Sequence, residues 1–198
     1  MTEIIPRWEW RSFAKDLGQA EKNLEKYECT RVLDSAEDYI VTTKGGNNVK
    51  VRDGKLDIKE LRNINDDTLE QWMPVLKVGF PCKAEEASRI YESFNMDAPV
   101  FDKDEFTYDE FIKDVIGGSE DLAVVKVVKK RFGYMLGEVI VELAEVTFDG
   151  VAWKTMAVEH TDPELVMSFV KELELNTFEN VNYIRAMKRS IGMSEVTA

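Results

Sequence analysis

The sequence of 198 residues contains little cysteine and almost no histidine. Its two cysteines, Cys29 and Cys82, lie in dissimilar surroundings and form no CxxC pair. The sequence therefore gives no disulfide framework and fits a reducing, cytoplasmic setting. His160 is the single histidine, which argues against metal sites and catalytic triads built on that residue. Any chemistry of this chain then depends on carboxylates and cations.

Long apolar runs and an excess of positive charge are also missing. No stretch approaches the roughly 20 apolar residues that a membrane-spanning helix needs. The formal net charge of −12 and the pI near 4.7 argue against general binding to nucleic acid or to an anionic membrane surface. The hydrophobic content of 44% is enough to bury a substantial core. We therefore predict a soluble protein with one globular domain over residues 1–198.

The periodicity of the sequence changes several times along the chain. Period-two patterns predict strands at the start of the chain, in hairpins from about 28 to 61, and in a three-strand meander from 122 to 161. Helical spacing between roughly 63 and 120 predicts a helical insertion, and two further helices end the chain. This order is typical of an α+β fold with a mainly antiparallel sheet.

Charged residues are sorted onto one face of almost every predicted strand. In "PRWEWRSF", Arg7, Glu9 and Arg11 alternate with Trp8 and Trp10, and successive side chains of a strand point to opposite faces. One explanation is a sheet that shows its charged face to water. The other is a curved sheet that encloses the charges. We favour enclosure because cations dominate some strands and glutamates others, and because predicted helices can cover the apolar faces.

An enclosed charged face needs a counter-ion or a ligand. Like charges brought together in a barrel repel one another and lose their hydration. A polyanion with a divalent metal suits such a lining, since Lys and Arg bind phosphate oxygens and carboxylates bind a hard cation such as Mg²⁺. The expected partner is thus a small molecule that contains phosphate groups.

The ordered set "RWEWR", "VKVR", "LDIK", "VVKKR", "VIVELAEV" and "AVEH" resembles the CYTH domain of the triphosphate tunnel metalloenzymes. The resemblance covers about residues 3–61 and 122–191. It implies a closed, eight-stranded antiparallel β-barrel whose bore is lined by basic and acidic side chains, with outer helices and the helical segment as an insertion. Members of the family include inorganic, thiamine and RNA triphosphatases and a class of adenylate cyclases, and they use Mg²⁺ or Mn²⁺.

The resemblance assigns substrate binding to a set of cations. The family opens with an ExExK strand, and the matching residues here are Arg7, Glu9 and Arg11, so a cation replaces the first glutamate. The remaining basic matches are Lys50 and Arg52 on one strand, Lys59 on the next strand, and Lys129 and Arg131 on a later strand. The substrate-binding residues expected on this basis are Arg7, Arg11, Lys50, Arg52, Lys59, Lys129 and Arg131.

The acidic matches are fewer than the family pattern has. Glu9, Glu142 and Glu159 are the expected metal ligands, with Glu9 and Glu159 as the catalytic pair. Glu145 is the alternative to Glu142 if a bulge shifts the register, and Ala157 stands where the final ExE pair has its first carboxylate. Three carboxylates are enough for one Mg²⁺, whereas a second metal is harder to support. Arg7 could neutralise a phosphate, or pair with a glutamate and abolish the metal site.

These observations lead to one functional hypothesis and two alternatives. The first is a metal-dependent phosphohydrolase that acts on a triphosphate-containing substrate, either inorganic triphosphate or an organic or nucleoside triphosphate. The second is a non-catalytic phosphate- or nucleotide-binding module, which the departures at Arg7 and Ala157 favour. The third is an adenylate cyclase, for which no residue supplies adenine recognition. The oligomeric state stays open.

Overall fold

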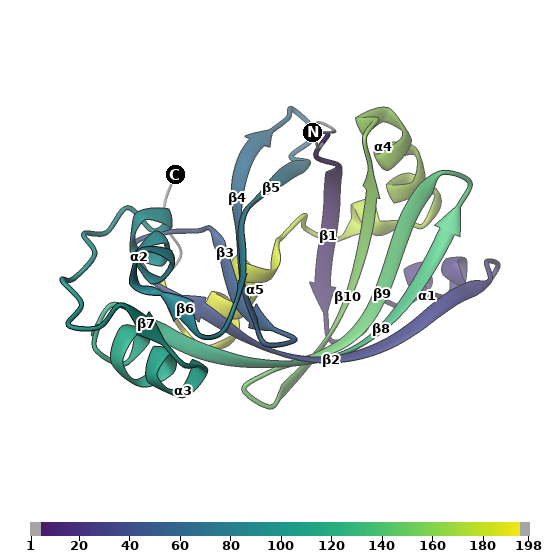
Figure 1. Cartoon of the computed structure of the whole chain (residues 1–198). Coiled ribbons are helices and arrows are strands. Elements are labelled where there is room, and N and C mark those ends of the chain that lie inside the picture. The colour runs from purple at the N-terminus through teal and green to yellow at the C-terminus, as the bar shows by residue number, and fades with distance from the viewer. Residues whose placement is uncertain (1–4, 195–198) are drawn as a thin grey trace. The chain divides into compact units, whose positions relative to one another are not determined.

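The computed structural model describes residues 5–194 and contains a closed antiparallel barrel. Its strand order is β1-β10-β9-β8-β2-β3-β4-β5 (Figure 1). The barrel strands are β1 (Trp8–Ala14), β2 (Cys29–Val41), β3 (Asn48–Arg52), β4 (Lys55–Ile64), β5 (Glu70–Gly79), β8 (Ala123–Leu136), β9 (Val139–Phe148) and β10 (Val151–His160). The predicted α+β class with a closed antiparallel barrel is confirmed.

Short helices and one small sheet complete the fold. The helices are α1 (Gln19–Leu24), α2 (Ala84–Ser93), α3 (Tyr108–Glu110), the π-helical turn η1 (Phe111–Ile116), α4 (Pro163–Glu172), the 3₁₀ turn η2 (Leu175–Thr177) and α5 (Tyr183–Ser190). The small sheet pairs β6 (Cys82–Lys83) with β7 (Glu105–Phe106). Within residues 5–194, no helix has both the length and the apolar character needed to cross a membrane.

The chain divides into two compact units, and several barrel strands contribute to both. The first unit comprises Met1–Ser35, Leu61–Met73 and Val128–Asn182. The second comprises Ala36–Glu60, Pro74–Val127 and Tyr183–Ala198. Each unit has its own apolar core, and the charged residues of interest also fall into one group per unit.

In the first unit, helices α1 and α4 cover the apolar face of strands β1, β9 and β10. Trp10, Val141, Met156 and Val158 are buried in one cluster with residues of both helices. Helix α4 lies along β1 and β10, as Figure 1 shows, and Asp162 caps it by accepting a hydrogen bond from the backbone of the next turn. Since side chains alternate along a strand, the charged residues on the opposite face of these strands point into the barrel.

The second unit builds its core in the same way. Ile40, Val49, Val51, Leu56 and Ile58 form one face of strands β2, β3 and β4, and they pack in one cluster with side chains of α2 and η1. The opposite face of these strands carries Glu37, Lys50, Arg52, Asp57 and Lys59. The pairing register sets Glu37 opposite Arg52 and Lys50 opposite Asp57. Polar residues of the second unit thus share one inward face as well.

The prediction of a helical segment over 63–120 is wrong for its first part. Strand β4 runs to Ile64, and Glu70–Gly79 forms the barrel strand β5. The apolar residues of this stretch fit helical spacing as well as strand spacing, so periodicity alone does not decide between them. Pro74 lies beyond the short pairing of β5 with β1, which joins only Gln71 to Trp8 and Glu70 to Glu9. Helices occur only from α2 onward within this segment.

A polar segment continues the hydrogen bonding of β1 where its pairing with β5 stops. The backbone N–H of Arg11 donates to Asn180 Oδ1 at 2.8 Å, and the N–H of Val181 donates to the carbonyl of Arg11 at 2.7 Å. Asn182 Nδ2 donates to both carboxylate oxygens of Glu70, at 2.9 and 3.1 Å. Residues 180–182 thereby fix the backbone at Arg11 and the side chain at Glu70.

Candidate functional site

The first unit gathers most of the predicted site residues on its inward face. We call this group the first cluster, and its members are Arg7, Glu9, Arg11, Arg131, Glu142 and Glu159. Arg7 Nε donates to Glu159 Oε2 at 3.2 Å. Arg131 Nη1 lies 3.7 Å from Glu142 Oε2. Arg11 joins Glu9 of β1 to Glu142 of β9, which also pairs with Arg131 of β8, while Arg7, just before β1, pairs separately with Glu159 of β10.

Arg11 is the most enclosed cation of the first cluster. Its side chain is 6% exposed. Its Nε donates to Glu9 Oε1 at 2.6 Å, and its Nη1 lies 3.6 Å from Glu142 Oε1. The same Nη1 donates to Thr155 Oγ1 at 3.3 Å. One guanidinium thus contacts carboxylates from two strands, β1 and β9, that are separated by β10.

Ala157 lies between Arg11 and Glu142 in the pairing register. Arg11 is opposite Ala157 across β1 and β10, and Ala157 is opposite Glu142 across β10 and β9. Ala157 is fully buried. The small side chain of Ala157 leaves room for the Arg11 side chain to extend over β10. The absence of the carboxylate that the CYTH pattern has at this position therefore allows Arg11 to contact Glu142.

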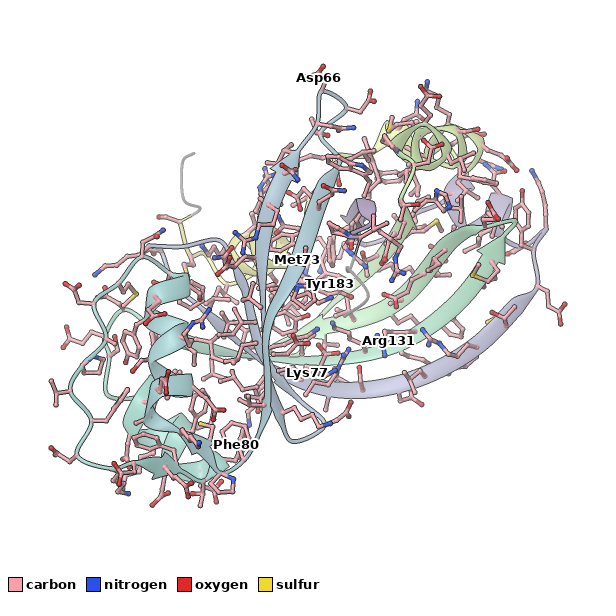
Figure 2. The ribbon with its side chains drawn as sticks, turned by 45° about the horizontal axis from the view of Figure 1, so that its top comes forward. Asp66, Met73, Lys77, Phe80, Arg131 and Tyr183 are labelled. Atoms are coloured by element: carbon pink, nitrogen blue, oxygen red, sulfur yellow. The ribbon has the colours of Figure 1, made fainter. Side chains whose placement is uncertain are left out.

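Arg131 holds a buried donor that no acceptor satisfies. Its Nε is buried and has no hydrogen-bond partner among the described residues. Leaving such a donor unsatisfied costs about 1–3 kcal/mol. Figure 2 labels Arg131 on strand β8. Lys129 is two residues away on the same strand, so it shares this inward face, and its side chain is also buried.

Three carboxylates lie in register across neighbouring strands of the first unit. Glu70 of β5 is opposite Glu9 of β1, and Glu9 is opposite Glu159 of β10. Burial raises the pKa of Glu159, and the negative charge of Glu9 raises it further, while Arg11 and Arg7 act in the opposite direction. Glu70 is absent from the sequence-based prediction because its strand was read as a helix. Its carboxylate accepts from Trp72 Nε1 at 3.1 Å and from Asn182.

The second unit carries a smaller, more buried group, which we call the second cluster: Glu37, Lys50 and Arg52. The Glu37 side chain has no exposed surface. Lys50 Nζ lies 3.1 Å from one of its carboxylate oxygens, and Arg52 Nη1 lies 3.8 Å from the other. Burial lowers the pKa of Lys50, and the negative charge of Glu37 counteracts part of that effect. Lys59, opposite Asn48 on the neighbouring strand, shares this face.

Glu37 was not predicted as a site residue. It lies in β2, where "SAEDYIV" alternates Glu37 and Tyr39 on one face with Asp38 and Ile40 on the other. That alternation was present in the sequence and places Glu37 beside the basic pair of β3. The strand alternation is therefore a signal from which Glu37 can be predicted, although it matches none of the residues on which the resemblance depends.

The structure decides between the two candidates for the inward acid of β9. Glu142 contacts Arg11 and Arg131, whereas Glu145 lies three residues along and so points to the opposite face. Glu145 lines a hollow of about 530 Å³ together with Lys129, Lys130 and Lys154. None of the six residues of the first cluster lines this hollow.

The carboxylates of the first cluster are the right type of ligand for Mg²⁺, but their arrangement does not fit a metal site. Each of the three expected ligands is engaged by an arginine: Glu9 by Arg11, Glu142 by Arg11 and Arg131, and Glu159 by Arg7. Across residues 5–194, no three acidic, cysteine or histidine side chains come together as metal ligands. The arginines therefore compensate the charge of all three carboxylates.

Comparisons with known proteins support the fold. No family model and no curated protein matches the sequence. Among solved structures, a conserved hypothetical protein of Pyrococcus furiosus is similar with a TM-score of 0.52 and 17% identity, over 90% of this chain and 98% of that one. The HpAC1 protein of Hippeastrum is described as a candidate adenylyl cyclase with a dominant triphosphatase activity. Its TM-score is 0.51 and its identity 14%, over 95% of this chain and 97% of that one.

A third similar structure is the PH1819 protein of Pyrococcus horikoshii OT3. Its TM-score is 0.50 and its identity 16%, over 93% of this chain and 99% of that one. At such low identities the likeness shows the fold alone. That fold agrees with the barrel that the resemblance to CYTH domains predicts, and this chain shares it over nearly its whole length.

Proposed function

We propose that this protein binds a triphosphate-containing small molecule on the inward cations of its barrel. The observation that carries the proposal is the buried Nε of Arg131, which has no acceptor among the described residues. A phosphate oxygen accepts hydrogen bonds from a guanidinium in a fork geometry. Binding would satisfy this donor and add a charge-assisted hydrogen bond within a partly enclosed site.

Further cations near Arg131 favour a ligand with several phosphate groups over a single phosphate. Lys129 shares the inward face of β8 with Arg131, and Arg7 has a half-exposed side chain that can exchange Glu159 for a ligand. Lys50 and Arg52 of the second unit pair with the buried Glu37 and belong to a separate group. The HpAC1 protein, which has this fold, is described as a triphosphatase, and this agrees with a triphosphate as the ligand class.

Thermal unfolding with added tripolyphosphate tests the binding proposal. A ligand at 100 times its Kd stabilises a protein by about 2.7 kcal/mol, which raises the midpoint by about 5–10 °C for a chain of this size. Orthophosphate at the same concentration serves as the comparison. Arg131→Gln should remove most of the shift, while Arg89→Gln, which alters an exposed pair with Glu92 on α2, should keep it. Equal shifts in both variants contradict the proposal.

A metal-dependent phosphohydrolase is the second candidate. The observation in its favour is that Glu9, Glu142 and Glu159 all lie in the first cluster. Phosphate release from inorganic triphosphate, ATP and thiamine triphosphate, each with Mg²⁺, Mn²⁺ or EDTA, tests it. In an enzyme of this kind Glu159→Gln should abolish turnover and keep most of the binding. If no phosphate is released from any of these substrates but tripolyphosphate stabilises the protein, the binding function is supported and the enzyme is not.

A further inference from the structure

Arg11 compensates two carboxylates that come from different strands. Its Nε and Nη1 lie 2.6 Å and 3.6 Å from oxygens of Glu9 and Glu142. A divalent cation bound between Glu9 and Glu142 would balance the same two negative charges. Because Arg131 also contacts Glu142, two arginines balance these two glutamates. The cluster is thus electrically balanced by the chain's own side chains.

The position of Ala157 makes this bridge possible. Ala157 is opposite both Arg11 and Glu142 in the register, and it is fully buried. Any longer side chain there would lie in the path of the Arg11 guanidinium. Thr155, two residues away on the same face, accepts a hydrogen bond from Nη1. This bond helps to fix the guanidinium over β10.

We infer that the guanidinium of Arg11 takes the place of a divalent cation between Glu9 and Glu142, so that a triphosphate-type anion binds at the first cluster without Mg²⁺ or Mn²⁺. The inference rests on the proposed function. Arg11 stays with its two carboxylates, and other cations contact the anion. Arg131 offers the unsatisfied Nε. Arg7, whose side chain is 52% exposed, can leave Glu159 at little cost because exposed ion pairs are weak.

Calorimetric titration of the wild-type chain with inorganic tripolyphosphate, in EDTA and in Mg²⁺, is the direct test. We expect the Kd in EDTA to equal or be smaller than the Kd with Mg²⁺, because the magnesium chelate carries less negative charge. Binding that is tenfold or more tighter with Mg²⁺ overturns the inference and leaves the proposed function standing. No binding in either buffer contradicts the proposed function, and the inference falls with it.

Arg11→Met removes the bridge and keeps an unbranched, uncharged side chain. We expect tripolyphosphate affinity in EDTA to fall about tenfold or more, since Glu9 and Glu142 would repel the anion once the charge of Arg11 no longer compensates them. Mg²⁺ should restore most of that affinity. Mg²⁺ alone should also raise the unfolding midpoint of this variant and not that of the wild type, which is a readout independent of turnover.

Arg89→Met is the matched control, because Arg89 also pairs with a glutamate, at 3.1 Å, but on the surface of α2. It should behave as the wild type in both buffers. An Arg11→Met variant whose affinity falls equally in EDTA and in Mg²⁺ overturns the inference. If that variant does not fold, Arg11→Lys keeps one charge as a compact ammonium that cannot fork between two carboxylates, and it should acquire the same Mg²⁺ dependence. The wild-type titration decides the question even if neither variant folds.

Discussion

The two charged clusters of this protein share residue types but differ in access to solvent. In the first cluster the carboxylates of Glu9, Glu142 and Glu159 are 16–24% exposed. In the second, Glu37 has no exposed surface and its partner Lys50 is 8% exposed. Breaking a buried ion pair leaves an uncompensated charge away from water, whereas an accessible pair exchanges partners at small cost. The first cluster is therefore suited to bind a ligand, and the second to hold the fold.

Glu37→Gln should have the largest effect on stability. The substitution leaves Lys50 and Arg52 without their buried carboxylate, and breaking such a pair costs about 3–5 kcal/mol. Urea unfolding measures the change. Glu92→Gln on the surface of α2 breaks an exposed pair with Arg89 and should cost less than about 1 kcal/mol. Similar losses in the two variants would remove the distinction between the clusters.

Arg11→Met should cause the second-largest loss of stability. Its removal deprives Glu9 and Glu142 of a charged hydrogen-bond partner or ion-pair partner, and we expect a loss of about 2 kcal/mol in the free energy of unfolding. The two carboxylates keep some access to water, so the loss should be smaller than that of Glu37→Gln. The same urea titration, run side by side, checks the order. A larger loss for Arg11→Met would mean that the first cluster is the more structural one.

The pH dependence of stability should separate the clusters through Lys50. Burial lowers its pKa in the folded state, so the unfolded chain binds more protons at this residue. Its contribution to stability is then fully present above the ordinary lysine pKa of about 10.4 and is lost as pH falls through the lowered value. Urea unfolding at several pH values should show wild-type stability rising with pH relative to Lys50→Met. A constant difference contradicts this assignment.

Of these substitutions, Arg7→Gln should change the free energy of unfolding least, but it should clearly weaken the binding of tripolyphosphate. The Arg7 side chain is 52% exposed, and exposed ion pairs contribute about 0–1 kcal/mol. Affinity for tripolyphosphate should nevertheless fall about tenfold, because a charged contact to the ligand is lost. Arg89→Gln supplies the control for both quantities. A variant that loses stability and keeps its affinity would assign Arg7 to the fold instead of the site.

Alternation along single strands predicted much of this arrangement. Glu9 and Arg11 share one face of β1 with Trp8 and Trp10 on the other, and Arg7 directly precedes the strand, as "RWEWR" indicates. Closure of the barrel came from the resemblance, because periodicity does not show how strands pair. The choice between Glu142 and Glu145 required the register of β9, and a shift of one residue would reverse every side chain of that strand.

The residues that the sequence did not reveal depend on long-range pairing. Glu70 belongs to a strand whose apolar spacing also fits a helix, and its position beside Glu9 comes from a pairing of only two residues. The bridge from Arg11 to Glu142 depends on a small residue in a third strand, Ala157. The sequence gives Ala157 as a missing carboxylate, and the structure shows it as space for the Arg11 side chain.

A crystal structure with inorganic tripolyphosphate tests the central claim most directly. We predict that phosphate oxygens contact Arg131 Nε and Arg7, that Arg11 stays between Glu9 and Glu142, and that crystals grown with EDTA show the same contacts. Tripolyphosphate found instead in the hollow beside Glu145, Lys130 and Lys154, with Arg7 still on Glu159, would contradict the account.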